Sequence, residues 1–316
     1  MADPKLRVKQ SGMGGSGYRL PFLLDEAGKA TVVPGVTTVT GFSYKPGVVQ
    51  WAVDNTAAYA VANIDALLSR TEEQGYGMLR WYHKRKPDID NLLDDELRSH
   101  HIGVLDDAAN LGTWIHDYIE ASVNGDFEPT PLNEKHVEMA TAWEEFKAQH
   151  DIVPLATELT VFNRDEGYAG TLDGIWIIAC LHEIACFPGG EKVTPTLLDV
   201  KSSRSTWPEH YEQLAALGAC YESAVEVPEG TEGAFLHETK QWGKTWWVIG
   251  ETPGFSQYKV LHVRPGDYDN DGNYLEPYCR LEDAKHIDLH YESFLGSLAK
   301  KKTELKIKQR EKWEVF

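Results

Sequence analysis

The chain has 316 residues, of which 42% are hydrophobic and 25% charged, as in an ordinary folded globular protein. Its formal net charge of -18 argues against a protein coated in nucleic acid, because phosphate binding depends on Lys and Arg; a local basic groove is still allowed. No stretch approaches the roughly 18 apolar residues of a membrane span. The first twenty residues lack the apolar core of a secretory signal, so we expect a cytoplasmic protein.

The cysteines are sparse and form no C-x-x-C pair. They are Cys180, Cys186, Cys220 and Cys279. With no export signal, we expect free thiols in a reducing compartment.

The N-terminal half reads as a glycine-rich tail or hairpin (1–32) followed by a helical region (33–150). Apolar residues at helical spacing predict helices from Val48 to about Leu68, from Ile89 to Asn124 and from Asn133 to Gln149.

The second of these helices carries a possible site residue. Gly112, His116 and Glu120 recur at every fourth position and therefore share one helix face. The glycine would let another backbone approach, and His116 could face a site. The alternative is a histidine with an ordinary place in the core or on the surface, which is the more common case for a lone helical histidine.

A basic and aromatic run stands between the first two helices. It contains Arg80, Trp81, Tyr82, Lys84, Arg85 and Lys86. The run is either a solvated helix end or a surface that stacks bases and pairs phosphates, so it is our candidate for DNA binding.

Three strands are predicted in the middle of the chain, at Leu155 to Phe162, Thr171 to Ile178 and Thr196 to Lys201. The first contains Glu158, and the second carries Asp173 near its start.

The third strand brings a carboxylate and an ammonium group together. Residues i and i+2 of a strand face the same side, so Asp199 and Lys201 project together while Val200 turns into the core. With Asp173 from a neighbouring strand, this arrangement suits a divalent metal and an activated water. The alternative is a cross-strand ion pair at a sheet edge, which is common and contributes little.

The C-terminal half continues with a helix from Trp207 to about Glu222 that carries Tyr211 and Gln213. Strands are predicted at 233–238, 245–250 and 257–263, and a last helix from Arg280 to about Lys302. We divide this part into a core (151–299) and a basic tail (300–316), and expect 33–299 to form one compact unit.

Taken in order, the motifs resemble the PD-(D/E)XK nuclease superfamily in its RecB-like branch. A Gly-x-x-x-His helix precedes a strand with Glu158, then Gly-Thr-Leu-Asp173, Leu-Leu-Asp199-Val-Lys201 and a helix with Tyr-Glu-Gln213. The chain is most similar to phage-type exonucleases and to the mitochondrial genome maintenance exonuclease. Val33-Pro-Gly-Val-Thr-Thr-Val also resembles the P-S-V-T segment of those proteins, so the resemblance covers roughly residues 33 to 225.

The resemblance implies a set of site residues. His116, Asp173, Asp199 and the Val200 carbonyl would be metal ligands; Lys201 would be the catalytic lysine, and Gln213 the glutamine of the following helix. Glu158 and Tyr211 are possible additional members. One departure concerns the substrate side: the branch often has Tyr four residues after the glutamine, where this chain has Leu217.

The expected cofactor is Mg²⁺ or Mn²⁺, because oxygen ligands favour Mg²⁺ and an imidazole makes Mn²⁺ equally suitable. No iron–sulfur cluster is expected, since the cysteines lack the spacing of the cluster found in some RecB-like relatives.

The sequence therefore predicts an α/β fold with a restriction-endonuclease-like core, in which helices flank a central mixed sheet, and a helical N-terminal region. The expected function is a metal-dependent DNA exonuclease acting on single-stranded ends in phage-type replication, recombination or repair, located in the bacterial host cytoplasm if phage-encoded. The rivals are a structure-specific or restriction-type endonuclease, and a DNA-binding or regulatory protein with a vestigial site.

Overall fold

The structure is a computed structural model that describes residues 7–10, 15–24, 28, 30–41, 46–74, 92–163, 165–180, 195–225, 235–237, 245–247, 255–269 and 271–313. The chain forms two compact units, Met1–Ser43 with Gly112–Phe316, and Tyr44–Leu111. The first is called the core unit below and the second the helical unit.

The helical unit contains α2 (Pro46–Ala62), α3 (Ile64–Gln74) and the first part of α4 (Leu92–Asn124). A single helix was predicted over the region of α2 and α3, and this prediction is wrong at Asn63. The Asn63 side chain donates to the Tyr59 carbonyl, and its own carbonyl accepts the Leu67 amide. Asn63 therefore lies between the two helices and is hydrogen-bonded to both of them. The basic run 80–86 lies outside the described residues.

The core unit is built on a five-stranded sheet in the order β12-β9-β6-β5-β4. The strands are β4 (His150–Asn163), β5 (Tyr168–Cys180), β6 (Thr196–Lys201), β9 (Gln257–Arg264) and β12 (Tyr278–Asp283). The β6–β9 pair is parallel and the other pairs are antiparallel. The predicted α/β class with a central mixed sheet is confirmed. Strand β6 is buried along almost its whole length, as expected for a strand in the middle of a covered sheet.

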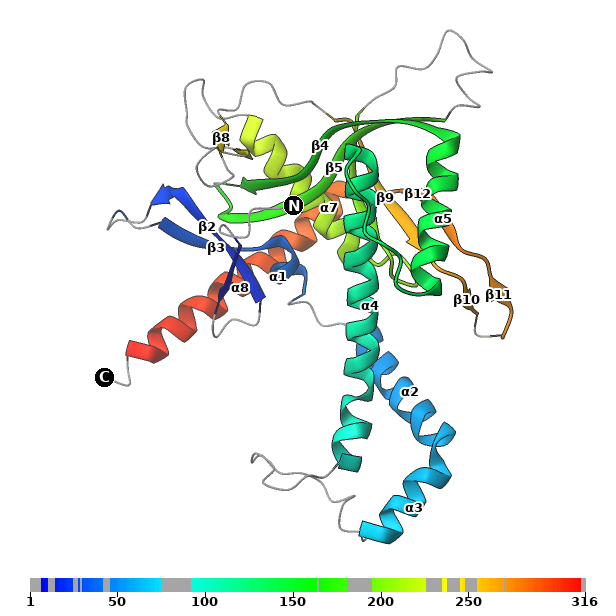
Figure 1. The fold of residues 1–316 in the computed structure, drawn as a ribbon. Helices are drawn as coiled ribbons and strands as arrows, with labels where there is room; N and C mark the ends of the chain where they lie inside the picture. The colour runs from blue at the N-terminus through cyan, green and yellow to red at the C-terminus, as the bar shows by residue number, and fades with distance from the viewer. Residues whose placement is uncertain are drawn as a thin grey trace. The chain divides into compact units, whose positions relative to one another are not determined.

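Helix α7 (Pro208–Val225) packs on β4, β5, β6 and β9, and Figure 1 shows it running beside the long β4–β5 pair. Helices α1 (Val36–Thr40) and α8 (Ile287–Trp313) pack against α7, and α5 (Glu134–Gln149) packs on β4, β9 and β12. A side chain at Gly170 would collide with Leu217 of α7 and Val36 of α1. The absence of a side chain at this position of β5 is what lets the three elements meet.

The predicted C-terminal helix begins too early in the sequence. Residues from Tyr278 to Asp283 form β12, and the helix starts at Ile287 after His286, whose φ is +55°. Pairing with β9 decides the structure here, because each residue from Tyr278 to Asp283 has a partner on that strand. An ion pair of 2.7 Å between Lys259 Nζ and Asp283 Oδ1 joins the two strands as well. Helix α8 then continues through the position at which the basic tail was drawn.

The N-terminal strands β1 (Arg7–Gln10), β2 (Gly15–Leu24) and β3 (Ala30–Pro34) form an antiparallel sheet of their own. Tyr18 of this sheet joins the main core, and so does Val36 of α1, which explains the apolar residues around the Val33 segment. The remaining strands form two short hairpins. They are β7 (Phe235–His237) with β8 (Thr245–Trp247), and β10 (Asp267–Tyr268) with β11 (Tyr274–Leu275). Among the described residues, no helix is long and apolar enough to cross a membrane.

Candidate active site

Strands β4 and β5 place two carboxylates opposite each other. Thr157 pairs with Gly174 and Leu159 with Leu172, so Glu158 stands across from Asp173. Glu158 has a φ of +51°, a left-handed backbone conformation that is uncommon for a residue with a side chain. Such strain persists where the surrounding structure enforces it, and it is frequent at functional sites.

Strand β6 supplies the next groups. The Asp199 carboxylate is fully buried, and the Lys201 ammonium lies 2.5 Å from its Oδ2 atom. The backbone amide of Val200, between them, donates to Asp173 Oδ2 over 2.7 Å. The antiparallel pairing of β5 with β6 therefore brings Asp173 beside the Asp-x-Lys segment, as the sequence predicted.

Helix α4 contributes His116. Its Nδ1 atom lies 3.5 Å from Asp173 Oδ2. One turn earlier, a side chain at Gly112 would lie 3.1 Å from Ser202 Oγ, so the small residue allows α4 to approach the end of β6. The predicted approach of another backbone at this glycine is not what is seen, because the nearby atom is a side-chain oxygen.

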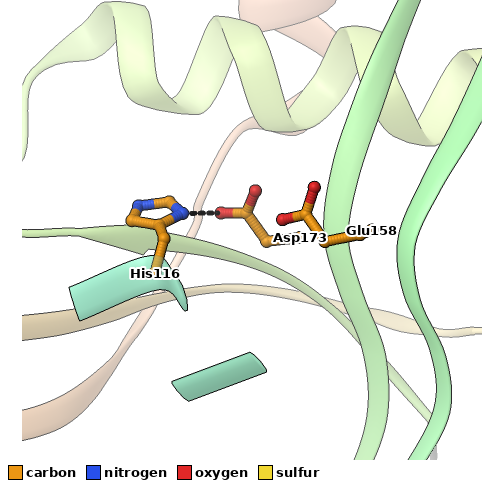
Figure 2. A group of neighbouring side chains, drawn as sticks. All are labelled: His116, Glu158 and Asp173. Carbon is orange, nitrogen blue, oxygen red and sulfur yellow. Dashed lines mark ion pairs between the residues drawn. The ribbon is translucent and has the colours of Figure 1, made fainter. Parts of the chain in front are cut away.

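His116, Glu158 and Asp173 form a group that could hold a metal ion, with one ligand atom of each lying within 4.8 Å of the others. Figure 2 shows the imidazole facing the Asp173 carboxylate, with the Glu158 carboxylate beside it. The three side chains come from α4, β4 and β5, which are separate elements of the core unit.

The carboxylates of this group are hard to ionise together. Burial raises the pKa of Glu158 to about 8, with the negative charge of Asp173 adding to the effect. Burial also raises the pKa of Asp173, and it raises that of Asp199 to about 6 despite the nearby Lys201 ammonium. The pKa of His116 is lowered to about 4, first by burial and then by repulsion from Lys201. At neutral pH the histidine is therefore an uncharged nitrogen donor.

These properties fit a divalent cation. The Asp199 oxygens are buried without a well-formed hydrogen bond, even though Lys201 lies close to one of them. A cation would satisfy such oxygens and offset the repulsion that raises the pKa of Glu158 and Asp173. One imidazole nitrogen together with carboxylate oxygens is a donor set that suits Mn²⁺ or Mg²⁺.

Two predicted site residues lie on α7. Gln213 is half-buried, and its proposed role stays a prediction. Tyr211 donates its hydroxyl to Thr206 Oγ1 over 3.1 Å, which links α7 to the connection between β6 and α7. The predicted DNA-binding residues 80–86 are outside the described part of the chain.

Sequence reasoning missed the residues that hold this connection, chiefly His262 and Glu282. His262 is buried and contacts the Ser203 carbonyl, and Glu282 accepts from Thr206. Their sequence context carried no signal, because a histidine within a strand pattern is ordinary and Glu282 was placed in a helix.

No family model and no curated protein matches the chain. Two crystal structures of LHK-Exo, an alkaline exonuclease from Laribacter hongkongensis, are similar to parts of it. The complex with dAMP is 13% identical with a TM-score of 0.28, and the match covers 65% of this chain and 86% of that one. The second structure is 11% identical over the same shares, with a TM-score of 0.25.

Proposed function

We propose that the protein is a metal-dependent nuclease of the PD-(D/E)XK type. The observation that carries the proposal is that the half-buried group of His116, Glu158 and Asp173 lies directly beside the strand segment with the fully buried Asp199 and Lys201. An isolated ion pair at a sheet edge would account for Asp199 and Lys201. It would not account for the Asp173 carboxylate beside them or for the strained backbone at Glu158.

His116, Asp173 and Asp199 would hold the cation, together with the Val200 carbonyl, and Glu158 is a candidate for a further ligand. When bound, the cation supplies a water of lowered pKa and polarises a phosphate oxygen. Residues of the chain orient the ligands and keep them in the right charge state. The Val200 amide orients the Asp173 carboxylate by its hydrogen bond. Burial keeps His116 neutral, so its nitrogen is free to donate an electron pair.

Lys201 is the group that would act on the reacting atoms. Its ammonium is mostly buried, at 16% exposure, and stands beside Asp199. From this position it can orient a water for attack at phosphorus and offset negative charge in the transition state. Gln213, on the helix that follows, is proposed to contact the substrate or the attacking water.

The proposed substrate is DNA, and the proposed reaction is exonucleolytic cleavage from single-stranded ends in phage-type replication, recombination or repair. This finer assignment rests on the sequence resemblance. End-labelled linear strands and closed circular strands, each with Mg²⁺ or Mn²⁺, would separate it from its rivals. An exonuclease degrades only the linear strand, an endonuclease opens the circle, and a protein with a vestigial site cleaves neither.

The metal assignment is tested by Asp173→Asn and Asp199→Ala. Both variants are expected to lose metal-dependent cleavage while remaining folded, because each removes a charged ligand from the group. The matched control is Asp283→Asn, which removes an exposed carboxylate from the same sheet. Calorimetric titration with Mn²⁺ should give strong binding heat for the wild type and the control and little for the two site variants. Equal heats in all four proteins would refute the assignment.

A further inference from the structure

The connection from β6 to α7, residues 202–207, begins directly after Lys201 and is held by side chains from two other strands. Arg264 of β9 donates to the Ser202 carbonyl over 2.9 Å. His262, also of β9, contacts the Ser203 carbonyl through Nε2 at 2.7 Å. Strand β6 has ended at this point, so these carbonyls have left the sheet ladder, and side chains of the longer neighbouring strand bind them instead.

Glu282 of β12 ties both ends of the connection together. Its Oε1 atom lies 3.0 Å from His262 Nδ1, and its Oε2 atom accepts the Thr206 hydroxyl over 2.9 Å. Thr206 in turn accepts from Tyr211 at the start of α7. Arg280 reaches Glu282 with distances of 2.9 and 2.7 Å. One carboxylate therefore anchors the segment near Ser203 and again at Thr206.

His262 has three polar contacts: Nε2 meets the Ser203 carbonyl, and Nδ1 lies 3.0 Å from Glu282 Oε1 and 3.3 Å from the Tyr278 hydroxyl. A backbone carbonyl can only accept, so Nε2 donates to Ser203. Partial burial acts to raise the pKa of Glu282, but the hydrogen bonds from His262, Arg280 and Thr206 outweigh it and lower that pKa. The carboxylate is therefore ionised and accepts from Arg280 and Thr206. His262 joins it to the Ser203 carbonyl.

We propose that His262 is a positioning residue for Lys201: with Glu282 it fixes residues 202–207 and so sets where the Lys201 ammonium stands. The inference rests on the proposed nuclease function and adds residues that none of the sequence motifs contain. The physical reason is that Lys201 is directly followed by the segment that His262 holds. Lys201 is the last residue of β6, so the orientation of its side chain depends on how the next two peptide groups are held. His262 lies beside Lys201 in the parallel β6–β9 register.

The test compares His262→Gln with His262→Asn. The amide nitrogen of glutamine takes roughly the place of Nε2 and can still donate to Ser203. The shorter asparagine takes the place of Nδ1 and cannot. Thr206→Val is a second, milder variant that breaks the link to Glu282 from the other end. The matched control is Lys259→Gln, which removes the neighbouring ion pair between the same two strands and touches no residue of the connection.

The first measurement is hydrogen exchange of residues 202–207 in the metal-free protein. His262→Asn and Thr206→Val are expected to speed exchange by about tenfold, as for the loss of one hydrogen bond, while Lys259→Gln does not. The second is calorimetric titration with Mn²⁺, which should give an unchanged affinity because the proposed ligands are not contacted. The third is cleavage kinetics: His262→Asn is expected to lower kcat by roughly 10- to 100-fold with little change in KM. The kcat of His262→Gln should fall much less than that of His262→Asn.

The outcomes separate the two proposals. Wild-type protein that fails to cleave DNA counts against the nuclease function, and the exchange rates still decide whether His262 holds the connection. The positioning role is overturned if folded His262→Asn keeps wild-type exchange or wild-type kcat. It is also overturned if Mn²⁺ affinity falls as far as kcat, since the histidine would then act through the metal ligands, or if His262→Gln is as impaired as His262→Asn.

Discussion

Lys201 and Asp199 lie two positions apart on β6 and share an ion pair, yet they differ in exposure. The Asp199 side chain is fully buried, whereas the Lys201 side chain keeps 16% of its surface exposed. The alternation of strand side chains predicted that they would project together. It could not predict which of them would be fully enclosed, because enclosure depends on how α4 and β5 pack.

Replacing Lys201 with alanine should separate its chemical role from a structural one. We expect turnover to fall by roughly 10²- to 10³-fold, the usual effect of losing one electrostatic donor. Mn²⁺ should bind at least as tightly, because a positive charge next to Asp199 is removed. Single-turnover cleavage and Mn²⁺ titration measure the two effects. A variant that cleaves at the wild-type rate would leave Lys201 with only its ion pair.

The raised pKa of Glu158 predicts that the stability of the metal-free protein depends on pH. Its pKa in the folded protein is about 8, against an ordinary value of 4.5, so folding favours the protonated form. The stabilisation that Glu158 contributes is therefore complete below pH 4.5 and is lost as the pH rises from 4.5 to about 8. Over this range the unfolded chain releases the proton of Glu158, whereas the folded protein still holds it. Glu158→Gln removes this loss. In EDTA, the Tm of the variant should match that of the wild type near pH 4.5 and exceed it increasingly towards pH 8.

The same experiment has a control in Asp283→Asn, whose carboxylate is mostly exposed. Its Tm difference from the wild type should not grow over this range in the same way. With saturating Mn²⁺ the order should reverse at about pH 8 if Glu158 is a ligand, because the variant then binds the cation less well. A Glu158→Gln difference that stays constant with pH would contradict the raised pKa.

At the level of elements, the prediction succeeded where a pattern was local. Strands β4, β5 and β6 alternate or are continuously apolar, and turn residues separate β4 from β5. It failed at β12, where Cys279 and Leu281 are only half-buried and the surrounding charged residues suit a helix equally well. What makes this segment a strand is the adjacent β9, including the Lys259–Asp283 pair, and such a long-range partner leaves no trace in a short window of sequence.

Gly170 gives a prediction for how β5, α1 and α7 fit together. A methyl group there would lie 2.5 Å from Leu217 Cδ2 and 3.0 Å from Val36 Cγ2, so Gly170→Ala must push both side chains away. We expect a loss of about 1–3 kcal/mol, typical of overpacking a filled core. Gly296→Ala in α8 is the control: its new methyl group meets no atom within 4 Å, and alanine favours a helix, so stability should rise slightly. Urea denaturation of both variants measures the difference.

For the whole molecule, the net charge of -18 limits how DNA can be held. The proposed DNA-binding segment is the basic run that includes Lys84, Arg85 and Lys86. Changing these three residues to serine should weaken DNA binding and flatten the plot of log affinity against log salt concentration. The slope should change by a little under one unit for each phosphate that the variant no longer binds. Fluorescence anisotropy over a range of salt concentrations measures it, and an unchanged slope in a folded variant would place the DNA track elsewhere.

The basic residues near the C-terminus are a second candidate for DNA binding, and they need a different test. Lys301 is buried, and Lys302 donates to the Glu166 carbonyl, so both take part in the fold of the core unit. Truncation after Ala299 would therefore disturb packing as well as charge. Lys306→Ser, on an exposed position of α8, changes charge alone and is the matched comparison for the basic run.

The parallel pairing of β6 with β9 affects when the site can exist during synthesis. Parallel neighbours cannot be joined by a tight turn, and the chain leaves β6 at Lys201 and returns only at Gln257. A ribosome that has made His116, Asp173 and Lys201 has not yet made the strand that covers the other edge of β6. The proposed site can therefore be completed only after residue 257 has been translated, when most of the chain has been made.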